Sequence, residues 1–251
     1  MHGKVVVITG GTSGIGLAAA HEFARRGAGV VVAGRRHDVG EAAVEELKAG
    51  GGTAYFVPCD VSSESEVESL FATTLREFGR LDYAFNNAGA RPRSPSRLLH
   101  EYPAEDLDYV LDIHVKGTFF CLKHEVLHFR AAQQPGAIVN MSSVYGVAAD
   151  LTAFPSYVAA KHAIIGLTRS AAIQYAADKI RVNAVLPGVI ETPLIANSQS
   201  TDPERLLRMH PVGRLGRPEE VANAVAWLCS DDAAFITGVA LPIDGGNGAR
   251  C

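Results

Sequence analysis

The chain has 251 residues, 47% of them hydrophobic and 20% charged, which is enough to bury one large core. The formal net charge of −4, with no basic stripe, argues against a nucleic-acid partner. No apolar run reaches the ~18 residues of a membrane span, and the first residues show no signal-peptide pattern, so no membrane partner is expected.

The first predicted strand runs directly into a glycine-rich turn. Residues 4–9 form a short β-branched run, and a helical pattern begins at residue 17 and stops at Gly27. Between them, residues 10–16 read Gly-Gly-Thr-Ser-Gly-Ile-Gly. Glycines let a backbone turn tightly beside a phosphate, and the helix N-terminus offers free N–H groups and a positive dipole end. We expect a dinucleotide site here; a purely structural turn is the alternative.

Two arginines follow the second predicted strand, residues 30–33. In many dinucleotide-binding folds an acid closes this strand and binds the ribose hydroxyls. Here Arg35 and Arg36 come first, and the next acid is Asp38. A guanidinium binds a phosphate through two parallel hydrogen bonds, so this position favours NADP(H). The alternatives are arginines that are solvated at a helix start, or that stack on adenine in an NAD enzyme.

Helices and strands alternate along the rest of the chain. Helices are expected at residues 41–48, 63–78, 104–129 (with a bend near Gly117), 155–177 and 219–230, and strands at 53–58, 81–85, 136–142, 180–186 and 238–243. This order predicts an α/β fold, a Rossmann-type doubly wound parallel sheet of about seven strands with helices on both faces. Residues 1–251 are expected to form a single NAD(P)-binding domain. Asp60, Asn86 and Asn87 would lie at the carboxyl edge, where such sheets bind ligands.

Two segments lack a regular pattern. Residues 91–97 read Arg-Pro-Arg-Ser-Pro-Ser-Arg and are expected to form a solvated loop, with contact to an acidic substrate as the alternative. Residues 191–216 show no strong periodicity. We expect them to form a substrate lid, because a connection of this length between core elements is often functional.

Tyr157 and Lys161 are four residues apart on a predicted helix, which places their side chains on one face with Cβ atoms about 5–6 Å apart. A free phenol has a pKa near ~10, and a nearby cation favours its phenolate. Ser143 could bring a hydroxyl donor to the same point. The three are candidates for proton transfer at a carbonyl or an alcohol; a surface Tyr–Lys pair is the alternative.

These motifs resemble those of the short-chain dehydrogenase/reductase family in its single-domain form of about 250 residues. The matching stretches cover the chain in the family's order: residues 9–16, 60–61, 86–89, Ser143, 157–161, 187–188 and 241–246. The resemblance implies that Tyr157 is the general acid or base, that Lys161 lowers its pKa and holds the nicotinamide ribose, and that Ser143 hydrogen-bonds the substrate oxygen. Ser142 is the fallback for Ser143. Cofactor contacts would come from Gly10, Thr12, Ser13, Ile15, Arg35, Asp60, Val61, Asn87, Gly89, Ile190 and Thr192.

One position departs from the family pattern. Relatives usually carry a catalytic Asn in an Asn-x-x-Gly pattern, where it helps to hold a water that links the lysine to solvent. Here His114 occupies that place, within Asp-Ile-His-Val-Lys-Gly at residues 112–117. Histidine can donate and accept, and it titrates near neutrality. We predict that His114 sustains the relay; a packing role, with the relay rerouted through backbone carbonyls, is the alternative.

The resemblance implies an NAD(P)(H)-dependent oxidoreductase that interconverts a ketone and a secondary alcohol. NADP(H) is favoured, although Ser13 is not the basic residue that many NADP-using relatives have. A hydrophobic or cyclic substrate is expected from Val144, Tyr145, Val147, Leu151, Phe154, Leu194 and Ile195. A non-redox epimerase- or dehydratase-like role, or a regulatory one, is the alternative. Relatives usually form homotetramers or homodimers. The four cysteines form no CxxC pair, so no metal site is expected and a reducing cytoplasm fits.

Overall fold

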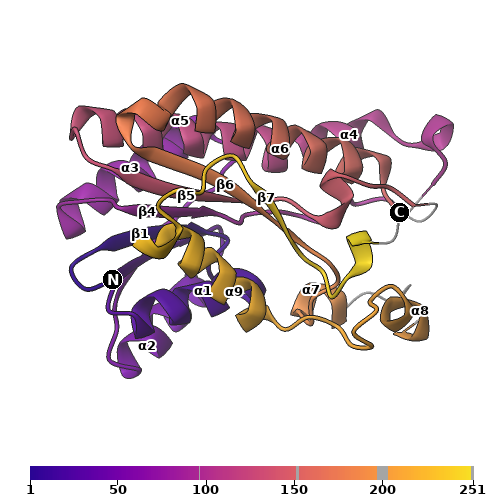
Figure 1. The fold of residues 1–251 in the computed structure, drawn as a ribbon, viewed down its shortest axis with the longest axis horizontal. Coiled ribbons are helices and arrows are strands. Elements are labelled where there is room, and N and C mark those ends of the chain that lie inside the picture. Colours follow the sequence, from indigo (N-terminus) through magenta and orange to yellow (C-terminus); the bar gives the residue numbers. More distant parts are fainter. Residues whose placement is uncertain (96, 151–152, 197–202, 250–251) are drawn as a thin grey trace.

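Seven parallel strands form the central layer of the protein (Figure 1). The computed structural model describes residues 1–95, 97–150, 153–196 and 203–249. The sheet order is β3-β2-β1-β4-β5-β6-β7, with strands Val5–Thr9 (β1), Gly29–Gly34 (β2), Thr53–Pro58 (β3), Tyr83–Asn86 (β4), Gly136–Met141 (β5), Ile180–Pro187 (β6) and Ala240–Ile243 (β7). The order reverses between β1 and β4, the point at which such sheets open a ligand crevice. The predicted doubly wound fold is confirmed.

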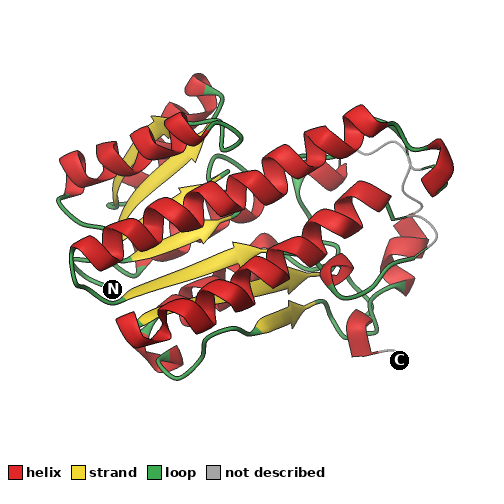
Figure 2. Ribbon diagram, turned by 90° about the horizontal axis from the view of Figure 1, so that it is seen from above, coloured by secondary structure: helices red, strands yellow, loops and turns green. Residues whose placement is uncertain are grey.

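Helices cover both faces of this sheet (Figure 1), and Figure 2 looks down on one of the two layers. One layer holds α1 (Gly14–Arg25), α2 (His37–Ala49) and α9 (Pro218–Cys229). The other holds α3 (Glu64–Phe78), α4 (Ala104–Leu111), α5 (Gly117–Ala131) and α6 (Pro155–Tyr175). Two short helices that were not predicted, α7 (Pro193–Ala196) and α8 (Pro203–Arg208), lie between β6 and α9. Within the described ranges, none of the helices combines the length and the apolar character that a bilayer crossing needs.

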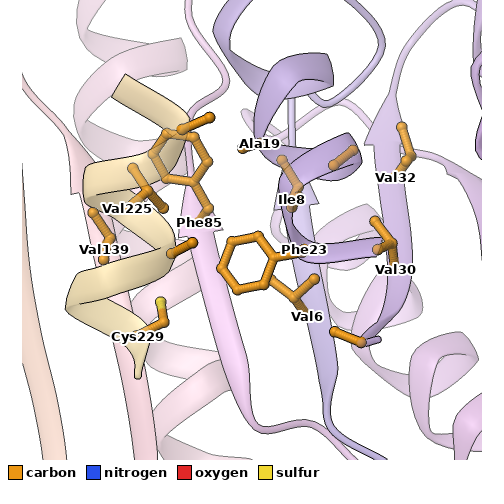
Figure 3. Packing of buried hydrophobic residues seen from close by; sticks show 14 of the residues in the cluster. Val6, Ile8, Ala19, Phe23, Val30, Val32, Phe85, Val139, Val225 and Cys229 are labelled. Carbon is orange, nitrogen blue, oxygen red and sulfur yellow. The ribbon is translucent and has the colours of Figure 1, made fainter. Parts of the chain in front are cut away.

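Apolar side chains of the strands contribute to a core on each face of the sheet. On one face Val6 and Ile8 of β1 pack with Phe23 of α1 and Val225 of α9 (Figure 3). On the other face Val5 and Val7 join residues of α3 and α5. Successive strand residues point to opposite faces, so burial on both sides explains why β1 is apolar throughout.

The long helix predicted at residues 104–129 contains an irregular turn. α4 ends at Leu111, residues 112–116 form a π-helical turn, and α5 continues from Gly117. A local widening of the helix therefore directly precedes Gly117, near which a bend was predicted, and such turns often mark functional sites. This turn carries His114, which is buried.

Candidate active site

In the turn between β1 and α1 the backbone at Gly16 packs closely against that at Gly10. Gly10 and Gly14 have positive φ angles of 62° and 53°, which favour glycine. A Cβ on Gly16 would lie 2.2 Å from the carbonyl oxygen of Gly10. The Asn87 side-chain amide donates to the carbonyls of Thr9 and Gly10 at 3.1 and 3.0 Å and fixes the turn. This glycine cradle at a helix N-terminus fits a pyrophosphate.

Three more predicted cofactor residues lie on the same turn. Ser13 is the exposed N-cap residue of α1, and its side chain makes no capping hydrogen bond. Thr12 and Ile15 flank it and are half-buried. A Cβ on Gly14 would lie 3.3 Å from the methyl group of Thr192, so the loop after β6 reaches the same turn.

The ends of β2 and β3 bring cations beside a carboxylate. Arg35 Nη1 lies 3.9 Å from Asp60 Oδ2; the Arg35 side chain is largely exposed, and that of Asp60 is half-buried. Asp60 Oδ1 also accepts from the backbone N–H and the hydroxyl of Ser62, at 3.0 and 2.7 Å. Arg36 is exposed at the start of α2, and Val61 is buried. An exposed ion pair at this distance is weak, so Arg35 can exchange it for a phosphate.

Two predicted cofactor residues are more constrained than the sequence suggested. Ile190 is buried in the core, and its backbone pairs with that of Gly216. Any ligand contact from Ile190 would therefore come from its main chain. A Cβ on Gly89 would lie 2.7 Å from Cε1 of His114, so this glycine is required for close packing.

Helix α6 and the end of β5 bring Ser143, Tyr157 and Lys161 together. Lys161 is buried, and its Nζ donates to the carbonyl oxygen of Met141 at 2.8 Å. The same Nζ lies 5.2 Å from the centroid of the Tyr157 ring. The Ser143 hydroxyl lies close enough to the Tyr157 phenol to lower its pKa. Ser142 instead donates to the carbonyl oxygen of Lys161 at 2.9 Å, a helix-anchoring contact that leaves Ser143 as the serine beside the phenol.

Burial has the largest effect on the pKa values of Tyr157 and Lys161. It raises the pKa of Tyr157 to about 12, although the Ser143 hydroxyl opposes the shift. Burial also lowers the pKa of Lys161 to about 7. The sequence-based expectation that Lys161 lowers the pKa of Tyr157 is therefore not met in the protein alone, because desolvation penalises both charged forms. At neutral pH Tyr157 carries its proton, which is the form that donates to a carbonyl oxygen.

His114 contacts both the loop after β4 and the triad of Ser143, Tyr157 and Lys161, through Tyr157. Its Nε2 lies 2.9 Å from the carbonyl oxygen of Ala90 and 3.2 Å from the Ala90 nitrogen, and its ring meets that of Tyr157 edge-on at 5.5 Å. Burial first, and then the charge of Lys161, lower the pKa of His114 to about 3. The expectation that it titrates near neutrality is therefore wrong. Its Nδ1 is buried without a protein partner, so a neutral His114 keeps one hydrogen-bonding atom for a small polar molecule.

Comparison with known proteins places the chain in a family whose members share these motifs. Residues 10–247 match the short-chain dehydrogenase model described as enoyl-(acyl carrier protein) reductase. The chain belongs to the short-chain dehydrogenase/reductase family. This short-chain dehydrogenase/reductase uses NAD(P)(H) to interconvert a ketone and a secondary alcohol, as its relatives support.

Similar members of the family align over nearly their full length. The 2,5-dichloro-2,5-cyclohexadiene-1,4-diol dehydrogenase of Sphingobium indicum is 43% identical over 98% of this chain and 97% of its own. The cis-4-hydroxycyclohexanecarboxylate dehydrogenase of Sinomonas cyclohexanicum is 44% identical over 97% and 96%. The crystal structure of levodione reductase aligns with a TM-score of 0.93 and 34% identity, covering 100% of both chains.

Part of the predicted apolar wall of this dehydrogenase/reductase lies beside the triad. The Tyr145 ring is 6.4 Å from the Tyr157 ring, and its hydroxyl donates to Asp150 Oδ2 at 2.8 Å. Val147 is exposed, Phe154 and Ile195 are half-buried, and Val144 is buried in the fold. Leu151 and the side chain of Leu194 lie outside the described residues.

The segment predicted as a lid has a fixed base. The Glu191 nitrogen donates to the carbonyl oxygen of Gly216 at 2.8 Å, which closes the two ends of the segment. His210 is buried, and its Nε2 accepts from the Val189 nitrogen at 3.0 Å. The middle of the predicted lid, residues 197–202, lies outside the described residues.

Two buried acids close to the site were not predicted. Glu125 is fully buried on α5, where Oε2 accepts from Asn86 Nδ2 at 3.2 Å and Oε1 has no protein partner. Asp106 is buried at the start of α4. The signal for Glu125 was available, since it shares a helical face with the apolar Leu122, Val126 and Phe129. In the part of the chain that the structure describes, no cluster of three or more His, Cys, Asp or Glu could hold a metal.

Proposed function

We propose that the protein is an NADP(H)-preferring dehydrogenase/reductase of cyclic ketones and alcohols. The observation that carries the proposal is the convergence of Ser143, Tyr157 and Lys161 near the glycine cradle. Two relatives are named for alcohols on six-membered rings. The Tyr145 ring beside Tyr157 suits such a substrate, because an aromatic face packs well against a ring. Consumption of NADPH in the presence of cyclic ketones tests the activity.

Each member of the triad has a distinct task in this proposal. When bound, NADP(H) supplies or accepts the hydride. Tyr157 donates its proton to the ketone oxygen in reduction and takes it back in oxidation, while Ser143 donates a hydrogen bond to the same oxygen. Lys161 donates one N–H to the carbonyl oxygen of Met141, and its other N–H groups would bind the ribose hydroxyls of the cofactor. His114 stays neutral, fixes Ala90 and offers Nδ1 to an ordered water.

The cofactor residues fall into three groups. Gly10, Thr12, Ser13 and Ile15 would surround the pyrophosphate at the N-terminus of α1. Asp60 and Val61 would flank the adenine, and Asn87, Gly89, Thr192 and the main chain of Ile190 would line the path to the nicotinamide. Arg35, aided by Arg36, would bind the 2′-phosphate.

Arg35→Asp is expected to lower the ratio of kcat/KM for NADPH to that for NADH by about 100-fold. The change removes a charge-assisted bidentate contact worth a few kcal/mol and adds a like charge. Steady-state kinetics with both cofactors and one ketone measure the ratio. Arg76→Asp, which makes the same charge change on the distant helix α3, should leave the ratio unaltered. A wild-type preference for NADH would contradict the assignment of Arg35.

We also infer a cytoplasmic homo-oligomer, a tetramer or a dimer. Supporting this, α5 exposes Phe119 and Leu127, and the neighbouring α6 exposes Ile173, large apolar side chains of the kind that subunit interfaces cover. Cys59, Cys121 and Cys229 are unpaired and buried, as suits a reducing compartment.

A further inference from the structure

A buried carboxylate organises the loop after β4. Asp106 accepts from the backbone nitrogens of Arg93 and Ser94 at 2.7 and 3.2 Å, and from the Tyr102 hydroxyl at 2.7 Å. Burial alone would raise its pKa, but these hydrogen bonds hold the pKa below its usual value, so Asp106 is ionised at neutral pH. Pro92 is also buried. The first half of the loop at residues 91–97 is therefore held by hydrogen bonds, while Arg93, Pro95 and Arg97 are exposed, in line with the prediction of a solvated loop.

The same carboxylate is connected to helix α6. The Tyr102 oxygen lies 2.8 Å from the hydroxyl oxygen of Ser156. A phenol has one proton and a carboxylate only accepts, so Tyr102 donates to Asp106, and Ser156 donates to Tyr102. Ser156 is buried and immediately precedes Tyr157 in the chain. The order Ser156 to Tyr102 to Asp106 thus runs from the start of the catalytic helix to the loop.

The loop has a second attachment to the site. Nε2 of His114 lies within hydrogen-bonding distance of both the nitrogen and the carbonyl oxygen of Ala90 and bonds one of them, depending on its tautomer, and the His114 ring contacts Tyr157. Residues 90–94 are therefore tied towards Tyr157 at both ends, by His114 at one and by Asp106 at the other. A segment held in this way keeps a fixed separation from the phenol.

We propose that Asp106, Tyr102 and Ser156 are positioning residues that hold residues 90–94 as one wall of the ketone site at a set distance from Tyr157. This proposal rests on the proposed function, because it assigns the wall to the ketone of that reaction. None of the three groups needs to contact the reacting atoms. Their effect is on how well a ring substrate is held in reach of the phenol, which is a matter of orientation.

Tyr102→Phe is the sharpest test, because it removes one hydroxyl and keeps the ring. We expect KM for cyclohexanone to rise about tenfold, the size of one lost hydrogen bond to a charged group, while KM for NADPH changes less than about twofold. Ser156→Ala should act in the same direction. The double variant should have the same KM for cyclohexanone as Tyr102→Phe alone, because both changes break the same series of hydrogen bonds from Ser156 to Asp106. Tyr55→Phe, the same change on an exposed residue of β3, is the control.

Hydrogen exchange of the free protein provides a readout that needs no turnover. Tyr102→Phe should speed amide exchange in both residues 90–95 and residues 153–161, and Tyr55→Phe should change neither. Faster exchange in only one of the two segments, or an equal rise in both KM values, would overturn the positioning role. If the wild type reduces no ketone, the proposed function fails, and the exchange result alone decides whether the two segments are coupled.

Discussion

Tyr157→Phe is expected to lower kcat for ketone reduction by about 10²–10⁴-fold, the usual contribution of a positioned general acid. The change removes the proton that the oxygen of the product alcohol must receive. It keeps the ring, which packs edge-on against His114 and Tyr145, so the fold and the cofactor site should be retained. Steady-state kinetics give kcat, and calorimetric titration with NADPH shows whether cofactor binding is preserved.

The matched control for this change is Tyr55→Phe, which removes an exposed phenol from β3 and should leave kcat within about twofold of the wild type. The kcat of Ser143→Ala should lie between those of Tyr157→Phe and Tyr55→Phe, because this change removes a hydrogen bond to the ketone oxygen but leaves the proton donor in place. Retention of more than about a tenth of the wild-type kcat by Tyr157→Phe would show that another group supplies the proton.

Glu125→Gln is expected to stabilise the protein at pH 8 and to leave its stability at pH 5 nearly unchanged. Burial raises the pKa of Glu125 from its ordinary 4.5 to about 8. Between these values the unfolded chain releases a proton that the folded chain keeps, so the free energy of unfolding falls as pH rises. One pKa unit corresponds to about 1.4 kcal/mol, so the gain from Gln is of the order of 4 kcal/mol at pH 8. Above pH 8 the gain should level off.

Urea denaturation at a fixed protein concentration, followed through the single tryptophan Trp227, measures this effect across pH 5–9. Glu45→Gln is the matched control, because it makes the same change on an exposed position of α2 and should alter neither the stability nor its pH dependence. Equal stability of wild type and Glu125→Gln at pH 8 would mean that Glu125 is ionised without cost in the folded protein.

Much of the fold followed from local pattern. The β-branched run at the start of the chain and the glycines behind it identify β1, the turn and α1, because burial on both faces and close backbone approach each demand particular residues. The spacing of Tyr157 and Lys161 placed both on one helix. Their proximity to Ser143 needed only the rule that parallel strands deliver their carboxyl ends to one edge.

Other features depended on tertiary contacts that no local pattern encodes. The π-helical turn at residues 112–116 carries the same residue types as an ordinary helix, yet it sets where His114 lies and, through burial, removes its charge. Asp106 contacts residues 13, 12 and 4 positions away, and one of these, Tyr102, in turn contacts Ser156 across 54 positions. The pKa values of Tyr157 and Lys161 likewise follow from desolvation, which depends on the whole fold.

The stoichiometry of NADPH consumption by the wild type tests the proposed reaction most directly. With cyclohexanone as the ketone, we predict that one NADPH is oxidised for each cyclohexanol formed, and that the open-chain 2-hexanone is reduced with a lower kcat/KM. Absorbance at the reduced nicotinamide band and chromatography of the products measure the two amounts together. Cofactor binding with no net oxidation of NADPH across a panel of cyclic ketones would contradict the reaction and favour a non-redox or regulatory role.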